Sequence, residues 1–210
     1  MYLARLWLDP FAEQARRDLA DPYQMHRTLV RAFVTNDFQA PPRFLWRLEP
    51  MSPWRDPQLI VQSAQSGRWR YLEDLGNYLK RPVESKEVDL DRLLQEGARY
   101  RFRIAANPTV TRNRKRYGLV GEEAQLAWLD RQGARHGFQV ESALVIGADV
   151  LGSRKDSQLV RLRRVYYEGI LTAMDLPALS NTLLAGIGPG KAFGLGLLSI
   201  VPVGRTDPAA

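Results

Sequence analysis

Hydrophobic and polar positions form two successive passages of the same order, each predicting strand, helix, strand, strand, helix and strand. The first passage ends near residue 92. Its apolar runs and alternations predict strands at 2–8, 43–49 and 58–65 and a short strand at 86–88. Its helical periodicity predicts helices from Pro22 to about Asn36 and from about 69 to 80.

The second passage opens with a strand whose two faces differ in character. Over 99–107, Tyr100, Phe102 and Ile104 alternate with Arg101 and Arg103, which is the two-residue period of a half-buried strand. One face of this strand is therefore cationic. The pattern then predicts a helix from about Gly121 to Arg135, strands at 138–147 and 158–173, a helix at 176–186 with Asp175 as N-cap, and a final strand at 195–202.

Two βαββαβ units predict an α+β protein made of two tandem ferredoxin-like, or RRM-like, domains. We place the N-terminal domain at 1–92 and the C-terminal domain at 93–210, because 210 residues suffice for two domains of roughly 100 residues. Each would have a four-stranded antiparallel sheet with two helices on one face, so that the other face is free to bind. The polar tail at 204–210 is expected to fray.

The composition narrows the function classes. The chain carries 30 Lys and Arg against 23 Asp and Glu, a net charge of +7, which favours an anionic partner such as nucleic acid. It has no cysteine and two histidines, so disulfides, thiolate zinc sites, thiol nucleophiles and all-histidine metal cages are excluded. The first nine residues do not resemble a signal peptide, and no stretch approaches the roughly 20 apolar residues that span a bilayer. We expect a soluble cytoplasmic protein with no cofactor and no membrane partner, and at this point metal catalysis through carboxylates alone stays open.

Positive charge is concentrated in one segment. Residues 99–117 contain no acid and hold seven cations, equal in number to the net charge: Arg99, Arg101, Arg103, Arg112, Arg114, Lys115 and Arg116. Asn107-Pro108 ends the strand, so Thr109–Tyr117 is predicted to form a protruding loop or hairpin whose closely spaced cations suit the phosphates of a nucleic-acid duplex. A solvated basic loop without a specific partner is the alternative. A second cluster, Arg161, Arg163 and Arg164, favours the binding interpretation.

A candidate catalytic pair lies at the start of the first predicted helix. Asp21 suits the N-cap, Pro22 suits the first helical position, and Gln24 completes a capping-box pattern. Tyr23 and His26 then fall in the first two turns, beside a buried stripe, and both can reach a cleft. Histidine exchanges protons near neutral pH, and tyrosine can hydrogen-bond a phosphate. The spacing is equally compatible with a histidine that has only a structural role at the edge of the buried face, packed beside a tyrosine. The predicted stripe comprises Met25, Leu29, Ala32 and Phe33.

A glycine-rich segment, GIGPGKAFGLG at 186–196, connects a predicted helix to a predicted strand. It lacks the residues of a P-loop and runs in the wrong direction for a dinucleotide fingerprint. Glycines permit close backbone approach, so Gly188 and Gly190 together with Lys191 are candidates to hold a phosphate. A tight connection packed between the domains is the alternative, and the two roles are compatible. His136 is expected to interact with the last carbonyls of its helix and is assigned no chemistry.

Five segments in order carry a resemblance that spans nearly the whole chain. They are LADPYQMH at 19–26, AANP at 105–108 with the basic loop after it, EEAQLAWL at 122–129, YYEG at 166–169 and GIGPGKAFGLGLLSIVP at 186–202. The glycine-rich ending is typical of the wider group of repeat-associated proteins. The YxxH pair, AANP and AWL restrict the resemblance to one family within that group. The chain resembles the CasE family of CRISPR repeat endoribonucleases from subtype I-E systems.

The resemblance implies a metal-independent endoribonuclease that binds the stem-loop of a CRISPR repeat and cuts precursor RNA at the 3′ base of the hairpin. Attack by a 2′-hydroxyl would leave a 2′,3′-cyclic phosphate and a 5′-hydroxyl. Tyr23 and His26 fall on the family's catalytic tyrosine and histidine, and Arg27 and Arg31 on the same helix are further candidates to contact RNA. The mature guide RNA would stay bound within the Cascade complex, whose other subunits are the expected protein partners.

Two alternatives from other function classes remain. The first is a non-catalytic RNA-binding subunit of a ribonucleoprotein, and the Tyr23/His26 pair is the feature that discriminates against it. The second is a binder of other acidic ligands with the same paired-domain fold. A steep salt dependence of RNA binding would count against this second alternative.

Overall fold

Two four-stranded antiparallel sheets form the body of the protein, whose computed structural model describes residues 1–36, 40–155 and 158–204. In the first sheet the strands lie in the order β2-β3-β1-β4, and in the second in the order β10-β5-β9-β8. Both orders are those of a βαββαβ sandwich, so the predicted tandem ferredoxin-like fold is confirmed. The division at residue 92 stays a prediction, and residues 205–210 of the predicted frayed tail lie outside the described residues.

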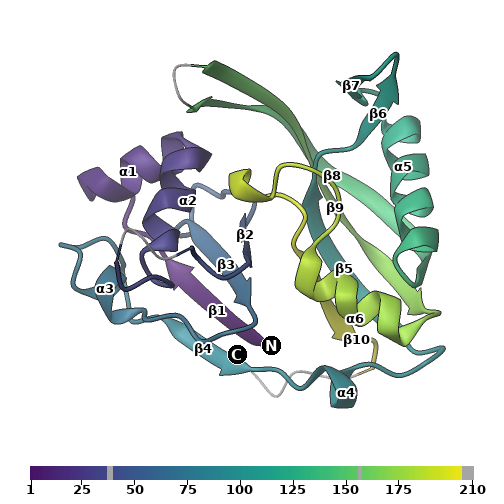
Figure 1. Ribbon diagram of the computed structural model, residues 1–210, viewed down its shortest axis with the longest axis horizontal. Coiled ribbons are helices and arrows are strands. Elements are labelled where there is room, and N and C mark those ends of the chain that lie inside the picture. Colours follow the sequence, from purple (N-terminus) through teal and green to yellow (C-terminus); the bar gives the residue numbers. More distant parts are fainter. Residues whose placement is uncertain (37–39, 156–157, 205–210) are drawn as a thin grey trace.

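The first sheet packs its apolar face against short helices. It comprises β1 (Tyr2–Trp7), β2 (Phe44–Leu48), β3 (Gln58–Ser63) and β4 (Glu84–Glu87), with helices α1 (Glu13–Ala20), α2 (Pro22–Val30) and α3 (Arg70–Glu73). Leu6, Leu59 and Val61 of the strands and Met25 and Leu29 of α2 are buried in one core. Figure 1 shows α1 and α2 side by side on this domain.

The second sheet carries two longer helices. It comprises β5 (Arg99–Ala106), β8 (Phe138–Lys155), β9 (Gln158–Ala173) and β10 (Leu198–Pro202), with α5 (Glu122–Arg135) and α6 (Leu176–Ala185). Tyr100, Phe102 and Ile104 point from β5 into a core that also holds Trp128 of α5 and Leu179 of α6. The alternation predicted for this strand is therefore confirmed. The remaining elements are α4 (Leu90–Leu93) between the sheets, the hairpin strands β6 (Thr109–Arg112) and β7 (Lys115–Gly118), and a 3₁₀ turn, η1 (Lys191–Phe193).

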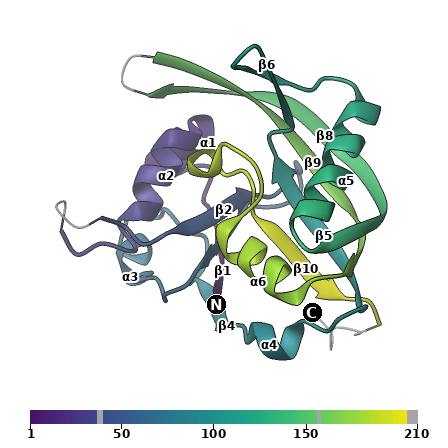
Figure 2. The same cartoon turned by 45° about the vertical axis from the view of Figure 1, so that its right-hand side comes forward.

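Two hairpins project from the second sheet. Strands β8 and β9 pair from Phe138↔Ala173 to Lys155↔Gln158, well beyond the body of the sheet, and the arm they form extends over α1 and α2 in both views (Figures 1 and 2). The predicted strand at 138–147 was too short, because the outer part of β8 pairs only with β9 and its GADVLGS sequence shows no clear alternation. The β6–β7 hairpin rises on the same side of the molecule (Figure 2).

Several predicted boundaries in the first domain were wrong. The helix expected to reach Asn36 ends at Val30, where bonds from Arg31, Ala32 and Phe33 to carbonyls three residues back tighten the chain into a turn. The poor helix formers that follow, Val34 and Thr35, do not continue it. The helix expected over 69–80 is only α3, because Gly76 and Asn77 have φ of 32° and 59°, which end a right-handed helix.

Two short helices were missed. In α1, with the sequence EQARRDLA, the buried residues are Ala15 and Asp18. A carboxylate on the buried face hides the helix from any search for apolar periodicity. That carboxylate is paired: Asp18 accepts hydrogen bonds from Tyr78 Oη at 3.0 Å and Gln14 Nε2 at 3.1 Å. Helix α4 has four residues and falls below the length that periodicity can detect.

The helix-free faces of the sheets are used partly to join the domains, so they are not free as predicted. Arg47 of β2 is buried and donates through Nη1 to the carbonyl oxygens of Arg103, at 2.9 Å, and Leu197, at 3.0 Å. Tyr166 of β9 donates its hydroxyl to the carbonyl oxygen of Leu48 at 3.1 Å. These contacts set the orientation of the first sheet relative to the second. Within the described residues no helix is long and apolar enough to cross a bilayer.

Candidate active site on helix α2 and its basic surroundings

The N-terminus of α2 is held by both domains. Asp21 is the N-cap, and its Oδ1 accepts the backbone N–H of Tyr23 at 2.9 Å, with Pro22 in the first turn as predicted. The same Oδ1 accepts the hydroxyl of Ser153, from the β8–β9 arm, at 2.5 Å. The other half of the predicted capping box does not form, because the Asp21 N–H donates to the Arg17 carbonyl at 3.1 Å. The arm therefore fixes the turn that carries the candidate pair.

His26 lies on the shoulder of the buried stripe, as its spacing predicted. Met25 and Leu29 on the adjoining face are fully buried, while His26 is half-buried. Its imidazole stacks on Phe44 of β2, with ring centroids 5.0 Å apart and an angle of 18° between planes. Phe44 is itself stacked on Phe33 at 4.8 Å. This packing sets the plane of the imidazole ring before any ligand binds.

Tyr23 faces the second domain. Its ring is half-buried and lies 6.4 Å from that of Phe193, tilted by 32°. Phe193 belongs to η1 in the glycine-rich connection. Residues three apart on a helix are neighbours, with Cβ atoms about 5–6 Å apart, so Tyr23 and His26 present two neighbouring side chains of different chemistry, Tyr23 against the second domain and His26 against β2 of the first.

The glycine-rich connection is a packed element. Gly188 and Gly190 have φ of 74° and 93°, where only glycine is unstrained. A Cβ at Gly188 would lie 3.2 Å from the Trp128 ring, and one at Gly190 would lie 2.9 Å from Leu195 Cδ1. A Cβ at Gly194 would lie 2.6 Å from the ring of Trp46 in the first domain. The alternative of a tight connection packed between the domains is therefore confirmed, and phosphate binding by Gly188 and Gly190 stays a prediction.

Lys191 is tied to this connection. Its Nζ donates to the Gly188 carbonyl oxygen at 2.6 Å, and the side chain is half-buried. Burial, together with the positive charge of Arg43, lowers the pKa of Lys191 below its ordinary value. An anion beside the ammonium group would offset both effects. The position is compatible with the predicted RNA contact, which stays a prediction.

The basic arm is a hairpin, one of the two forms predicted. Asn113 and Arg114 both have positive φ, 48° and 62°, as the two central residues of a type I′ turn require. The four predicted RNA-binding side chains are exposed, and no ion pair compensates any of them in the described part of the chain. They are Arg112, Arg114, Lys115 and Arg116.

The cationic face predicted for β5 is largely neutralised. Arg99 forms a bidentate pair with Glu141, the closest contact being 2.6 Å. Arg103 pairs with both Glu49 and Glu168. Sequence spacing could not show these partners, because they arrive from other strands and from the other domain. Of the seven clustered cations, Arg101 and the four on the β6–β7 hairpin have no ion pair in the described part of the chain, and only the four on the hairpin are grouped together.

The second cluster divides in the same way. Arg161 is exposed and Arg163 half-exposed on the β8–β9 arm. Arg163 lies against the β6–β7 hairpin, since a Cβ added at Gly118 would be 3.2 Å from the Cβ of Arg163. Arg164 is instead paired with Asp149 by two hydrogen bonds of 2.9 and 2.5 Å. Arg163 thus lies against β7 at Gly118, the end of the basic arm away from its turn.

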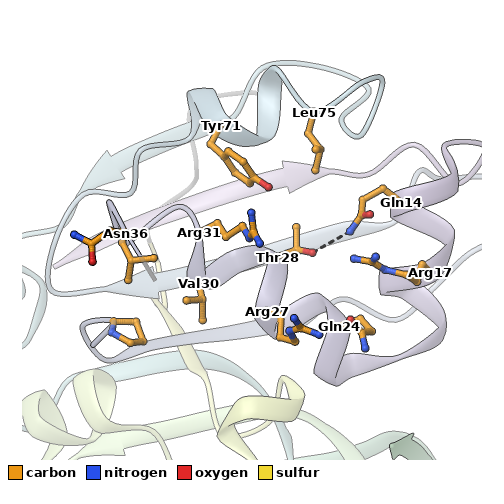
Figure 3. A pocket seen from close by; sticks show the side chains of 12 residues that line it. Gln14, Arg17, Gln24, Arg27, Thr28, Val30, Arg31, Asn36, Tyr71 and Leu75 are labelled. Carbon is orange, nitrogen blue, oxygen red and sulfur yellow. Dashed lines mark hydrogen bonds between the residues drawn. The ribbon is translucent and has the colours of Figure 1, made fainter. Parts of the chain in front are cut away.

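Arg27 lies on another side of α2 from His26, and Arg31, predicted on the same helix, is instead the C-cap that follows it. They line a hollow of about 490 Å³ between α1, α2 and α3, together with Arg17 (Figure 3). Arg17 was not among the predicted site residues because α1 was not predicted. Ser153 and Phe193 were missed for a different reason: both are brought to α2 from the second domain, and the residue types carry no chemical signal in the sequence.

His136 interacts with a carbonyl at the end of its own helix through its backbone, whereas its side chain contacts another helix. Its Nδ1 lies 2.9 Å from Thr182 Oγ1, so it links α5 to α6. The backbone N–H of His136 satisfies the Gly133 carbonyl at 3.0 Å. Burial, with the positive charges of Lys191 and Arg135, lowers the pKa of His136.

Comparison with known proteins gives consistent matches over the full chain. The family model described as CRISPR associated protein matches residues 1–202. The CRISPR-associated endoribonuclease Cse3 of Thermus thermophilus is 35% identical, with 96% of this chain and 100% of that protein covered. The CRISPR system Cascade subunit CasE of Escherichia coli is 30% identical, with 97% and 100% covered.

A solved structure of Thermus thermophilus Cse3, bound to an RNA representing a pre-cleavage complex, superimposes with a TM-score of 0.85 at 35% identity and covers 96% of this chain and 98% of that one. Sequence and structure therefore agree along nearly the whole length. This chain belongs to the CRISPR-associated protein family, in the group of the Cse3 and CasE proteins.

Proposed function

We propose that this protein is a metal-independent endoribonuclease that binds the stem-loop of a CRISPR repeat and cleaves precursor CRISPR RNA at the 3′ base of the hairpin. The observation that carries the proposal is the Tyr23/His26 pair on a helix held by both domains. It occurs in a chain that matches an endoribonuclease solved with pre-cleavage RNA over 96% of its length. The uncompensated cations of the β6–β7 hairpin support RNA as the ligand.

The reaction requires two proton movements and one in-line displacement. The 2′-hydroxyl of the nucleotide upstream of the cut attacks the adjacent phosphorus, and the bond from phosphorus to the 5′ oxygen breaks. One proton leaves the 2′-hydroxyl and one reaches the departing 5′ oxygen. The products are a 2′,3′-cyclic phosphate and a 5′-hydroxyl, and no co-reactant is consumed.

His26 is the proton-transfer residue in this proposal. Imidazole takes up or releases a proton near neutral pH, and the stack on Phe44 at 5.0 Å holds its ring plane fixed. Either the attacking hydroxyl or the leaving oxygen is its partner. A positioned proton-transfer group of this kind typically contributes about 100- to 10,000-fold to the rate.

Tyr23 positions the reacting groups. Its hydroxyl hydrogen-bonds the scissile phosphate or the nucleophile, while its ring is held against Phe193. Pre-set geometry of this kind reduces the entropy lost on reaching the transition state. The N-cap contacts of Asp21 with Tyr23 N and Ser153 Oγ make the position of this residue depend on the β8–β9 arm.

The RNA-binding surface surrounds this pair. The β6–β7 hairpin and Arg161 and Arg163 contact phosphates of the stem, whose A-form helix is recognised chiefly by shape. Lys191 and the amides at Gly188 and Gly190 hold the backbone near the junction, and Arg27 and Arg31 contact RNA on the far side of α2. The mature guide RNA then remains bound, in the cytoplasm, within a Cascade complex of the kind that contains the E. coli relative.

Cleavage of a synthetic repeat RNA by the purified protein in EDTA, with the product ends mapped, tests this function. The expected products carry a cyclic phosphate and a 5′-hydroxyl at one site at the hairpin's 3′ base. His26→Ala should slow cleavage by at least about 100-fold and keep hairpin affinity within a few-fold. His136→Gln, which replaces the other histidine of the chain, is the matched control and should cleave at the wild-type rate.

Two results would contradict the proposal. Cleavage that stops in EDTA and returns with a divalent ion would assign a metal to the reaction; in the described residues no group of three or more His, Cys, Asp and Glu side chains is placed to hold one. Tight hairpin binding without cleavage by wild-type protein would favour the second candidate, a non-catalytic RNA-binding subunit.

A further inference from the structure

The hollow beside α2 is formed entirely within the first domain. Gln14 and Arg17 come from α1, Gln24 and Arg27 from α2, Arg31 from the C-cap of α2, and Tyr71 from α3 (Figure 3). Its volume of about 490 Å³ lies within the range of roughly 300–1,000 Å³ that is usual for ligand sites. Tyr23, His26 and the glycine-rich connection do not line it.

The lining is strongly cationic. It includes three arginines and no carboxylate. Arg17 pairs at 3.2 Å with Asp18, whose side chain is fully buried behind it, and no ion pair engages Arg27 or Arg31 in the described part of the chain. Guanidinium groups present a planar fork of donors that matches phosphate. The hollow therefore suits an anion that carries phosphate oxygens.

Other lining groups suit a base as well as a phosphate. Tyr71 is 37% exposed, and in Figure 3 its side chain points into the space that contains Arg31. Aromatic rings bind unpaired bases by stacking, whatever the base sequence. Gln24 adds an amide with both donors and an acceptor. A single-stranded nucleotide offers a phosphate to the arginines, a free ring face to Tyr71 and polar base edges to Gln24. The paired bases of a duplex cannot present a free ring face.

The position of the hollow relative to Tyr23 and His26 indicates which nucleotides of the RNA it binds. Tyr23 faces Phe193 and the second domain, where the basic hairpin would hold the stem. Arg27, one turn further along α2, faces the hollow on the first domain alone. Because the stem lies 5′ of the cut, the strand 3′ of the cut leads away from the second domain, and it needs to cross only one helix, about 10 Å wide.

We propose that the arginine hollow binds the single-stranded nucleotides immediately 3′ of the scissile phosphate, with their phosphates on Arg17 and Arg31 and a base against Tyr71. This inference rests on the proposed function. It predicts that the enzyme grips both sides of the bond it cuts, and that it loses the contacts on the 3′ side when the downstream fragment departs.

The test compares two RNAs by equilibrium binding. One is the repeat hairpin ending at the nucleotide upstream of the cut. The other continues three nucleotides further and carries a 2′-deoxy sugar at that upstream nucleotide, so that it cannot be cleaved. Wild-type protein should bind the extended RNA roughly tenfold more tightly or better, and the difference in salt slope should approach about 1.4, because each single-strand phosphate contact contributes about 0.7.

Variants of the hollow should remove this difference selectively. The single variants Arg17→Gln and Tyr71→Leu should bind the extended RNA several-fold more weakly than wild-type protein, with affinity for the short hairpin unchanged. The double variant Arg17→Gln/Arg31→Gln should bind the extended RNA nearly as weakly as the wild-type protein binds the short one. The matched control is Arg16→Gln/Arg70→Gln, which removes the same charge from α1 and α3 at exposed residues outside the hollow. It should retain the wild-type difference.

Each other outcome has a defined meaning. Equal affinity of wild-type protein for the two RNAs would overturn this inference and leave the proposed function standing. Weakened binding of both RNAs by the hollow variants would place these residues in the hairpin interface, which also overturns it. Failure of wild-type protein to bind either RNA would overturn the proposed function itself.

Discussion

Neutralising the basic arm separates local RNA contact from the general charge of the protein. The variant changes Arg112, Arg114, Lys115 and Arg116 to glutamine and lowers the net charge from +7 to +3. All four side chains are exposed, so folding should be nearly unaffected, since surface substitutions usually change stability by less than about 0.5 kcal/mol. Gln at 114 takes the same positive φ of 62° that Arg114 already has.

The expected magnitude follows from the number of uncompensated charges. Each phosphate contact contributes about 0.7–0.9 to the slope of log K against log salt, so four contacts contribute roughly 3. Between 50 and 200 mM salt, the wild-type protein should therefore lose roughly 60-fold more affinity for the hairpin than the variant loses. Fluorescence anisotropy with labelled hairpin at several salt concentrations measures both slopes.

The control removes an equal charge from ion-paired surface residues. Changing Arg5, Arg70, Lys80 and Arg92 to glutamine also lowers the net charge to +3, but each of these residues has a carboxylate partner. The control should therefore keep a slope close to that of the wild type. If the arm variant and the control change the slope by the same amount, the arm contributes only to the overall field and the reasoning from uncompensated charge is refuted.

Three further substitutions test other parts of the structure. Gly188→Val should lower the melting temperature by several degrees, because it forces a branched side chain to a φ of 74° beside Trp128, a strain of order 1–3 kcal/mol; an unchanged melting curve would contradict the packing described. Lys191→Met should weaken hairpin binding while changing the melting temperature by only a few degrees, and equal affinity at every salt concentration would leave the connection with a structural role alone. His136→Gln should flatten the dependence of melting temperature on pH. The folded protein holds the pKa of His136 below the ordinary value of 6.5, so the unfolded chain binds the proton more readily and stability falls as the pH drops below about 6.5; a wild-type pH profile in the variant would rule this out.

Elements with clear periodicity were predictable because their burial is simple. The strand at 99–107 alternates, and the helix from 121 to 135 has an apolar side facing one sheet, so local pattern and tertiary position agree. The α1 helix fails this condition, since its buried face includes Asp18, which is stabilised by Tyr78 some 60 residues away. No periodicity rule can anticipate a buried carboxylate whose partner lies in another element.

For Tyr23 and His26, the sequence determined their position in the helix, and the tertiary structure determined their surroundings. The sequence determined that Tyr23 and His26 lie in the first turns of α2, because N-cap and proline preferences act locally and the 3.6-residue repeat places Met25 and Leu29 inward. It did not determine what surrounds them. Phe193 and Ser153 reach α2 only because the two sheets pack through Arg47 and Tyr166.

The sequence determined one part of the charge distribution and the tertiary structure determined the other. The sequence by itself determined the net charge of +7 and its concentration in 99–117, since these depend only on composition and order. Only the tertiary structure decided that Glu141 neutralises Arg99 and that Glu49 and Glu168 neutralise Arg103, while the β6–β7 hairpin remains uncompensated. The physical reason is that ion pairing acts over a few ångströms in space, and strand pairing brings together residues that are distant along the chain.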